Sequence, residues 1–252
     1  MYKLYVEMLE VMDAAFRDFA AALPKPVRVK HGPGWVFRFK GRDIRHVVVL
    51  KLALVQSTLR AALLLLEHGH TLQQAMLQRV IDEANEDILF LVYAVTNDTV
   101  TPLHQRYLDA FWAEEFGDAN DLIGTHQSRD MVPRQKIRAY LAKIEGKDLD
   151  PSRAAQVTKV LSKTYSGFIH GASTHIMETY GEMPPHFHTR GMLDTPRIPE
   201  YANDLWNYMY RGLCSHAFAA KLFGAQEHFD QLVAHSKKFE AAMGRQYGSA
   251  KT

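Results

Sequence analysis

The segment 71–96, TLQQAMLQRVIDEANEDILFLVYAVT, carries the strongest structural signal in the chain. Its apolar side chains recur every three or four residues, a spacing that places them on one face of an α-helix. From Ile88 to Val95 the segment is apolar on every side, so neighbouring helices must enclose it. These features predict a central helix in a multi-helix bundle, with Thr71 as its N-cap. The apolar stripe consists of Leu77, Val80, Ile81, Ala84, Ile88, Leu91, Val92 and Val95.

Helical periods of the same kind fill most of the remaining chain, and prolines and glycines separate them. The predicted fold is therefore all-α, a multi-helix bundle of seven or eight helices in a single domain spanning residues 1–252. Residues 117–130 are polar and predict a loop, while residues 182–199 contain four prolines and predict a long ordered loop or a flap. Further helices are expected over residues 2–23, 43–66, 101–116, 131–144, 150–180, 200–223 and 225–243.

Residues 28–41 follow a different pattern, because apolar residues alternate with arginine and lysine directly after the turn signal Gly-Pro-Gly at 32–34. This alternation predicts a short β-hairpin or an extended insertion. Aromatic rings interleaved with cations can stack on bases and contact phosphates. The same alternation also suits an amphipathic hairpin that covers the bundle. The aromatic and basic residues are Trp35, Phe37 and Phe39, with Arg28, Lys30, Arg38 and Lys40.

Composition excludes several classes of protein. A net charge of +2 over 252 residues gives no overall field that favours nucleic acid or acidic membranes, so any basic site must be local. The single cysteine, Cys214, cannot form an internal disulfide, and the N-terminal sequence lacks a signal-peptide pattern, so we expect a cytoplasmic protein. Lys51 and Arg60 interrupt the apolar stretch 47–66, which therefore predicts a buried helix and no membrane span.

The segment 163–175, KTYSGFIHGASTH, is the most distinctive candidate for chemistry. On a helix, Lys163, Ser166 and His170 share one face, and two glycines thin that surface. Histidine transfers protons near neutral pH, and a neighbouring lysine can hold a phosphate. The alternative interpretation is a helix-packing site in which His170 is a hydrogen-bonded core residue.

Arg79 and Glu83 form a second candidate group on the helix predicted over 71–96. They stand four residues apart and lie away from the main apolar face. One interpretation is an exposed ion pair that contributes a few tenths of a kcal/mol. The other is a buried polar group, completed by Glu86, that faces His170 across the bundle.

Two segments together resemble a widespread prokaryotic family of helical proteins of unknown function. The run 61–69, AALLLLEHG, followed by Arg79 and Glu83, looks like the opening of that family, and Tyr165, Ser166 and His170 match its Tyr-Ser-x-x-x-His landmark. The resemblance covers under a quarter of the chain. The family is similar to the HEPN superfamily of helical bundles, many of whose members are RNases or nucleotidyl-binding modules in toxin and phage-defence systems.

The resemblance implies a defence or toxin-type protein with RNA-directed activity, RNA or a nucleotide as partner, and a homodimer. In a metal-independent RNase of this kind, His170 would act as acid or base, Lys163 or Arg79 would hold phosphate, and Ser166 and Tyr165 would position it. HEPN nucleases carry an arginine, four to six residues, then a histidine. Here lysine replaces that arginine before His170, which departs from the pattern.

Two further features complete the sequence-based expectations. The literal HEPN spacing occurs at Arg211 and His216, but a chain rich in arginine and histidine yields such matches by chance. His186 and His188 could place two imidazoles on one side of an extended segment, yet the Glu-x-x-His repeats of helical di-metal sites are missing. We therefore predict no metal and no cofactor. The alternative function is a non-catalytic helical module that binds a small ligand or a protein.

Overall fold

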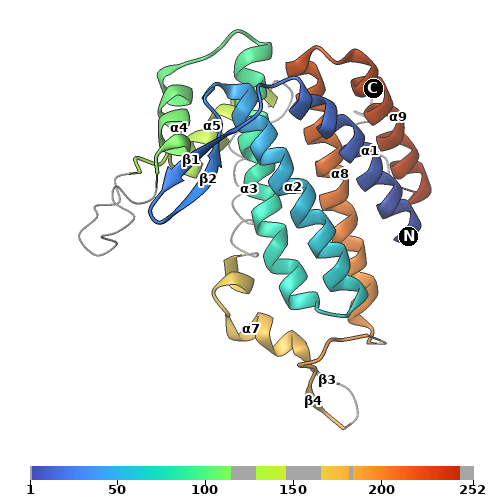
Figure 1. The fold of residues 1–252 in the computed structure, drawn as a ribbon. Coiled ribbons are helices and arrows are strands. Elements are labelled where there is room, and N and C mark those ends of the chain that lie inside the picture. Colours follow the sequence, from blue (N-terminus) through green and yellow to red (C-terminus); the bar gives the residue numbers. More distant parts are fainter. Residues whose placement is uncertain (1, 115–128, 146–165, 182–183, 194, 245–252) are drawn as a thin grey trace.

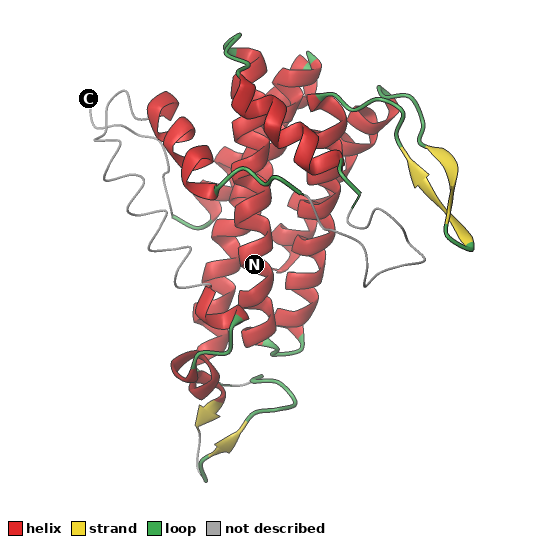
Figure 2. Ribbon diagram, turned by 90° about the vertical axis from the view of Figure 1, so that its left-hand side faces the viewer, coloured by secondary structure: helices red, strands yellow, loops and turns green. Residues whose placement is uncertain are grey.

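The structure is a computed structural model that describes residues 2–114, 129–145, 166–181, 184–193 and 195–244. Long helices form the body of the molecule, and two small hairpins project from it (Figures 1 and 2). The prediction of an all-α bundle with a short hairpin near residues 28–41 is confirmed. The elements are α1 Tyr2–Ala21, β1 Val27–His31, β2 Gly34–Arg38, α2 Ile44–Glu67, α3 Thr71–Thr96, α4 Pro102–Trp112, α5 Arg134–Glu145, α7 Ser173–Ile176, the 3₁₀ turn η2 Met177–Thr179, β3 Tyr180–Gly181, β4 His186–Phe187, α8 Arg197–Phe223 and α9 Gln226–Ala242.

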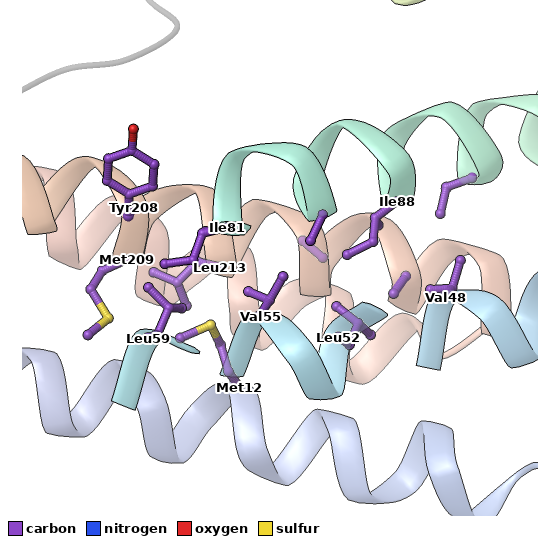
Figure 3. Close-up of a cluster of buried hydrophobic side chains, with 14 of the residues drawn as sticks. Met12, Val48, Leu52, Val55, Leu59, Ile81, Ile88, Tyr208, Met209 and Leu213 are labelled. Carbon is purple, nitrogen blue, oxygen red and sulfur yellow. The ribbon is translucent and has the colours of Figure 1, made fainter. Parts of the chain in front are cut away.

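Helix α3 lies at the centre of the bundle, where it packs against α2, α5 and α8. The core between these helices is apolar, with Leu52 and Val55 from α2 meeting Ile88 from α3 and Leu213 from α8 (Figure 3). Helix α1 closes one side, and its Met12 is fully buried. The enclosure expected for the second half of α3 is therefore present.

Helix α2 belongs to this core. Among the described helices it alone is long and apolar enough to cross a membrane, but 56% of its most apolar window is buried inside the bundle. Its N-cap is Asp43, whose side chain accepts a hydrogen bond from the backbone N–H of His46. The expectation of a buried helix in this region agrees with the packing.

Several helix ends differ from the sequence-based prediction. The N-cap of α3 is His70, and Thr71 is already helical. Helix α4 ends at Trp112 because Ala113 adopts extended backbone angles, φ −66° and ψ 131°. Helix α5 begins at Arg134, three residues later than predicted, directly after Pro133, whose ring disfavours a helical conformation at the preceding residue.

The continuous helix predicted over 150–180 is wrong beyond His170. Residues 150–165 lie outside the described residues, and a helical turn covers 166–169. Gly171 then has a φ of 63°, a left-handed conformation that ends a right-handed helix. The chain restarts as the short α7, continues into η2 and turns extended at Tyr180.

The described part of the region 182–199 is an ordered connection. Strand β4 pairs with β3, and the backbone N–H of Met192 donates to the carbonyl of Gly69 at 2.8 Å, in the α2–α3 turn. Helix α8 begins at Arg197, three residues earlier than predicted. Pro199 is tolerated there because the first backbone N–H groups of a helix need no intrahelical partner. Most of the loop predicted over 117–130 lies outside the described residues.

Candidate nucleic-acid interface

The β1–β2 hairpin projects from the bundle as a two-stranded ribbon (Figure 2). Strands β1 and β2 pair antiparallel, and residues that pair directly across an antiparallel ribbon point to the same face. Arg28 pairs with Phe37, and Lys30 pairs with Trp35. These four side chains therefore share one face, which we call the aromatic face.

The aromatic face is open to solvent. Trp35 is 49% exposed and Phe37 is 57% exposed, with their ring centroids 5.2 Å apart in an edge-to-face arrangement. The guanidinium of Arg28 lies 3.8 Å from the Trp35 ring centroid, a cation–π contact that orients both groups. The sequence allowed two interpretations of this hairpin, contact with nucleic acid or cover for the bundle. The aromatic face does not cover the bundle, because large rings directed into the bundle would be buried.

Positive charge is concentrated around this hairpin. Residues 25–45 contain seven lysines and arginines and one acidic residue, Asp43, a net charge of +6. The other 231 residues contain 23 basic and 27 acidic residues, a net charge of −4. The modest charge of the whole chain therefore conceals a strongly basic segment.

Several of these cations form no ion pair with a carboxylate of the described residues. They include Arg28 and Lys30 on the aromatic face and Arg42 and Arg45 just beyond the hairpin. Arg38, by contrast, is paired with Glu114 at the end of α4, through Nε at 2.8 Å and Nη2 at 3.0 Å. Cations without acidic partners raise the local positive potential, which attracts phosphates.

The sequence-predicted pair Arg79 and Glu83 lies on α3 and is half-buried. Arg79 Nη2 is 2.5 Å from Glu83 Oε1, and Arg134 of α5 approaches the second carboxylate oxygen at 3.5 Å. The pair therefore belongs to a charge network between α3 and α5. Its described partners do not include His170.

The other predicted residues fall at the end of the helical turn before Gly171. His170 is exposed and its backbone N–H bonds to the carbonyl of half-buried Ser166, so the two side chains belong to one turn. Exposure rules out the alternative of a buried core histidine. Lys163 and Tyr165 lie outside the described residues.

Sequence reasoning missed a buried ionic cluster centred on Asp87 of α3. This carboxylate is 1% exposed and receives Lys51 Nζ at 2.7 Å and Arg134 Nη1 at 2.5 Å. The hydroxyl of Tyr107 on α4 also bonds to it, and burial, followed by the charge of Asp87, raises the pKa of that phenol. The signal available in the sequence was a run of acidic residues inside an otherwise buried helix.

A neighbouring pair extends this cluster along α3. Arg138 of α5 donates through Nε to Glu86 at 2.8 Å, and burial raises the pKa of Glu86 against the opposing effect of Arg138. Since every one of these carboxylates faces a cation, the cluster has the character of a structural clamp between helices.

The literal Arg-x4-His match does not form a unit. Arg211 bonds to Asp82 on α3, whereas His216 is fully buried and faces α2. The Nδ1 of His216 lies 2.7 Å from the Gly212 carbonyl and its Nε2 lies 2.9 Å from Gln56 Nε2, a pattern that fits a neutral ring. Burial lowers the pKa of His216 to about 4.

His186 begins β4 and His188 directly follows this strand, with their ring centroids 4.3 Å apart. Within the described ranges, no group of three or more histidine, cysteine or acidic residues has a geometry that could hold a metal ion. Cys214 lines a small apolar cavity between α8 and α9, where burial raises the pKa of its thiol to about 11.

Comparison with protein-family models, with curated proteins and with solved structures finds no match to this chain. The resemblance to HEPN bundles accordingly stays a prediction.

Proposed function

We propose that this protein binds single-stranded RNA through the aromatic face of the β1–β2 hairpin. The observation that carries this proposal is the exposed Trp35–Phe37 pair standing beside Arg28 and Lys30 on one face of a projecting ribbon. Stacking of a base on an aromatic side chain contributes about 1–3 kcal/mol. Two rings with two adjacent cations provide both stacking surfaces and phosphate contacts.

The basic residues beyond the hairpin extend this surface toward the bundle. Arg42 and Arg45 lie at the start of α2 and line, together with the single acidic residue Asp43, a cavity of about 550 Å³ beside α4. An RNA strand that stacks on the hairpin can therefore continue over a positive surface. A single strand fits this arrangement best, because its bases are free to leave their own stack.

The direct test is fluorescence anisotropy with a labelled single-stranded RNA of mixed sequence. Loss of two stacking contacts in Trp35→Ala/Phe37→Ala should weaken binding at least tenfold, since about 1.4 kcal/mol corresponds to a factor of ten. The matched control is Leu64→Ala on α2, where the leucine is 56% exposed and far from the hairpin in sequence. Binding by the double variant at the level of the control variant would contradict the proposal.

RNA cleavage is a second candidate function, favoured by the exposure of His170. Together with the resemblance, it predicts EDTA-resistant cleavage that His170→Ala abolishes without lowering the thermal midpoint. A folded wild type that binds RNA and leaves it intact would reject this candidate and retain the binding function. The homodimer implied by the resemblance is tested by light scattering on the same preparation.

A further inference from the structure

A cavity of about 370 Å³ lies at the root of the β1–β2 hairpin, between β2 and the end of α4. Its volume falls within the range of about 300–1,000 Å³ typical of small-molecule pockets. Its apolar lining is rich in aromatic residues, namely Phe37, Phe39, Phe111 and Trp112. The charged residues in the described part of its lining are Arg38, Arg42 and Glu114.

Among the residues that the structure describes, Glu114 is the only acidic one that lines this cavity. Its hydrogen bonds with Arg38 lower its pKa, so at neutral pH the carboxylate is ionised and can only accept hydrogen bonds. Arg38 uses one lone pair on each carboxylate oxygen, at 2.8 and 3.0 Å, and leaves the others available. Because the side chain is also 53% exposed, a ligand can reach it.

The backbone around the cavity is fixed by a contact between its two sides. Trp112 Nε1 donates to the carbonyl of Arg42 at 2.9 Å, which ties α4 to the residue that follows the hairpin. The guanidinium of Arg42 has no ion pair with a described carboxylate. A cavity lined by aromatic residues, with an ionised carboxylate and an available arginine, suits a flat ring that carries adjacent N–H donors and a phosphate.

We infer that this cavity selects guanine in the bound RNA. Guanine presents two neighbouring donors, N1–H and the N2 amino group, which the Glu114 carboxylate can accept together. Adenine and cytosine each place a ring-nitrogen acceptor, N1 and N3 respectively, beside the amino group, and this acceptor would face the carboxylate unfavourably. Uracil offers the single donor N3–H and therefore leaves one carboxylate oxygen without a partner from the base. Arg38 positions Glu114, and Arg42 takes the phosphate. This inference rests on the proposed RNA-binding function.

The test uses uridine oligomers that carry one central guanine, inosine or adenine. Inosine lacks the N2 amino group, so the series removes the two donors stepwise without any change to the protein. The guanine probe should bind roughly five- to 150-fold more tightly than the adenine probe, with inosine between them. Equal affinity of the wild type for the three probes would overturn the inference.

Glu114→Gln should lower the affinity for the guanine probe to the affinity for the adenine probe. The matched control is Asp109→Asn, an exposed carboxylate on α4 that does not line the cavity, and it should retain the preference. Both variants should keep the wild-type thermal midpoint, since both side chains are at the surface. A guanine preference that survives Glu114→Gln would also overturn the inference.

Calorimetric titration with GMP and AMP separates the two proposals. Preferential binding of GMP by a protein that does not bind the oligomers would support the cavity and reject RNA binding by the aromatic face. Binding of the oligomers with no preference for GMP over AMP would support the aromatic face and overturn the guanine site.

Discussion

Replacement of Asp87 by asparagine tests the clamp that holds α3 to α2, α4 and α5. The substitution keeps the shape of the side chain and removes the charge that Lys51, Arg134 and Tyr107 share. Breaking a buried ion pair costs about 3–5 kcal/mol, because the remaining partner stays buried without compensation. Lys51 and Arg134 are 17% and 28% exposed, so water offsets part of this loss. We therefore expect Asp87→Asn to lower the free energy of unfolding by about 2–4 kcal/mol.

The assay is urea unfolding at neutral pH, supported by the thermal midpoint. For a chain of this size the expected loss corresponds to a decrease in the midpoint of about 4–16 °C. Asp109→Asn serves as the control and should change stability by less than about 0.5 kcal/mol. A double-mutant cycle of Asp87→Asn with Lys51→Met should reveal a coupling energy above about 0.5 kcal/mol. The clamp would be refuted if Asp87→Asn were as stable as the control variant and the changes in unfolding free energy were additive in the cycle.

Three further predictions concern other parts of the fold. Burial lowers the pKa of His216 to about 4, so the contribution of His216 to stability is complete above about pH 6.5 and declines as the pH falls toward 4, by about 1.4 kcal/mol for each pH unit. His216→Gln should therefore flatten the plot of unfolding free energy against pH in this range, and parallel plots for variant and wild type would contradict the prediction. Gly191→Ala should lower the thermal midpoint, because Gly191 has a φ of 109° and a Cβ there would collide with the carbonyl of His68; an unchanged midpoint would contradict the close approach. Cys214, whose thiol pKa is about 11, should react with iodoacetamide at pH 8 more slowly in the folded than in the urea-unfolded protein, and equal rates would contradict the assigned burial.

Local sequence patterns predicted the elements that local physics controls. The three- and four-residue spacing within 71–96 predicted α3 nearly to its ends, and the Gly-Pro-Gly turn predicted the β1–β2 hairpin. The break at Gly171 was missed because a glycine inside a helical period is tolerated in many helices, and a positive φ cannot be read from the period itself.

The arrangement of charges could not be predicted from spacing alone. Asp87 meets Lys51, 36 positions earlier, and Arg134, 47 positions later, so their pairing depends on how the helices pack. The same holds for the aromatic face, since the alternation in 28–41 is identical whether that face covers the bundle or points to solvent. The partition between buried and exposed rings arises only in the tertiary structure.

The salt dependence of RNA binding tests the central claim most directly, because it counts the phosphates that the protein contacts. For a single strand the slope of log K against log salt is about −0.7 for each phosphate neutralised. If Arg28 and Lys30 each contact a phosphate, Arg28→Ala/Lys30→Ala should make the slope less negative by about 1.4. Lys237→Ala, at an exposed position on α9, should leave the slope unchanged. Equal slopes for wild type and the hairpin variant would place the RNA elsewhere on the protein and contradict the account.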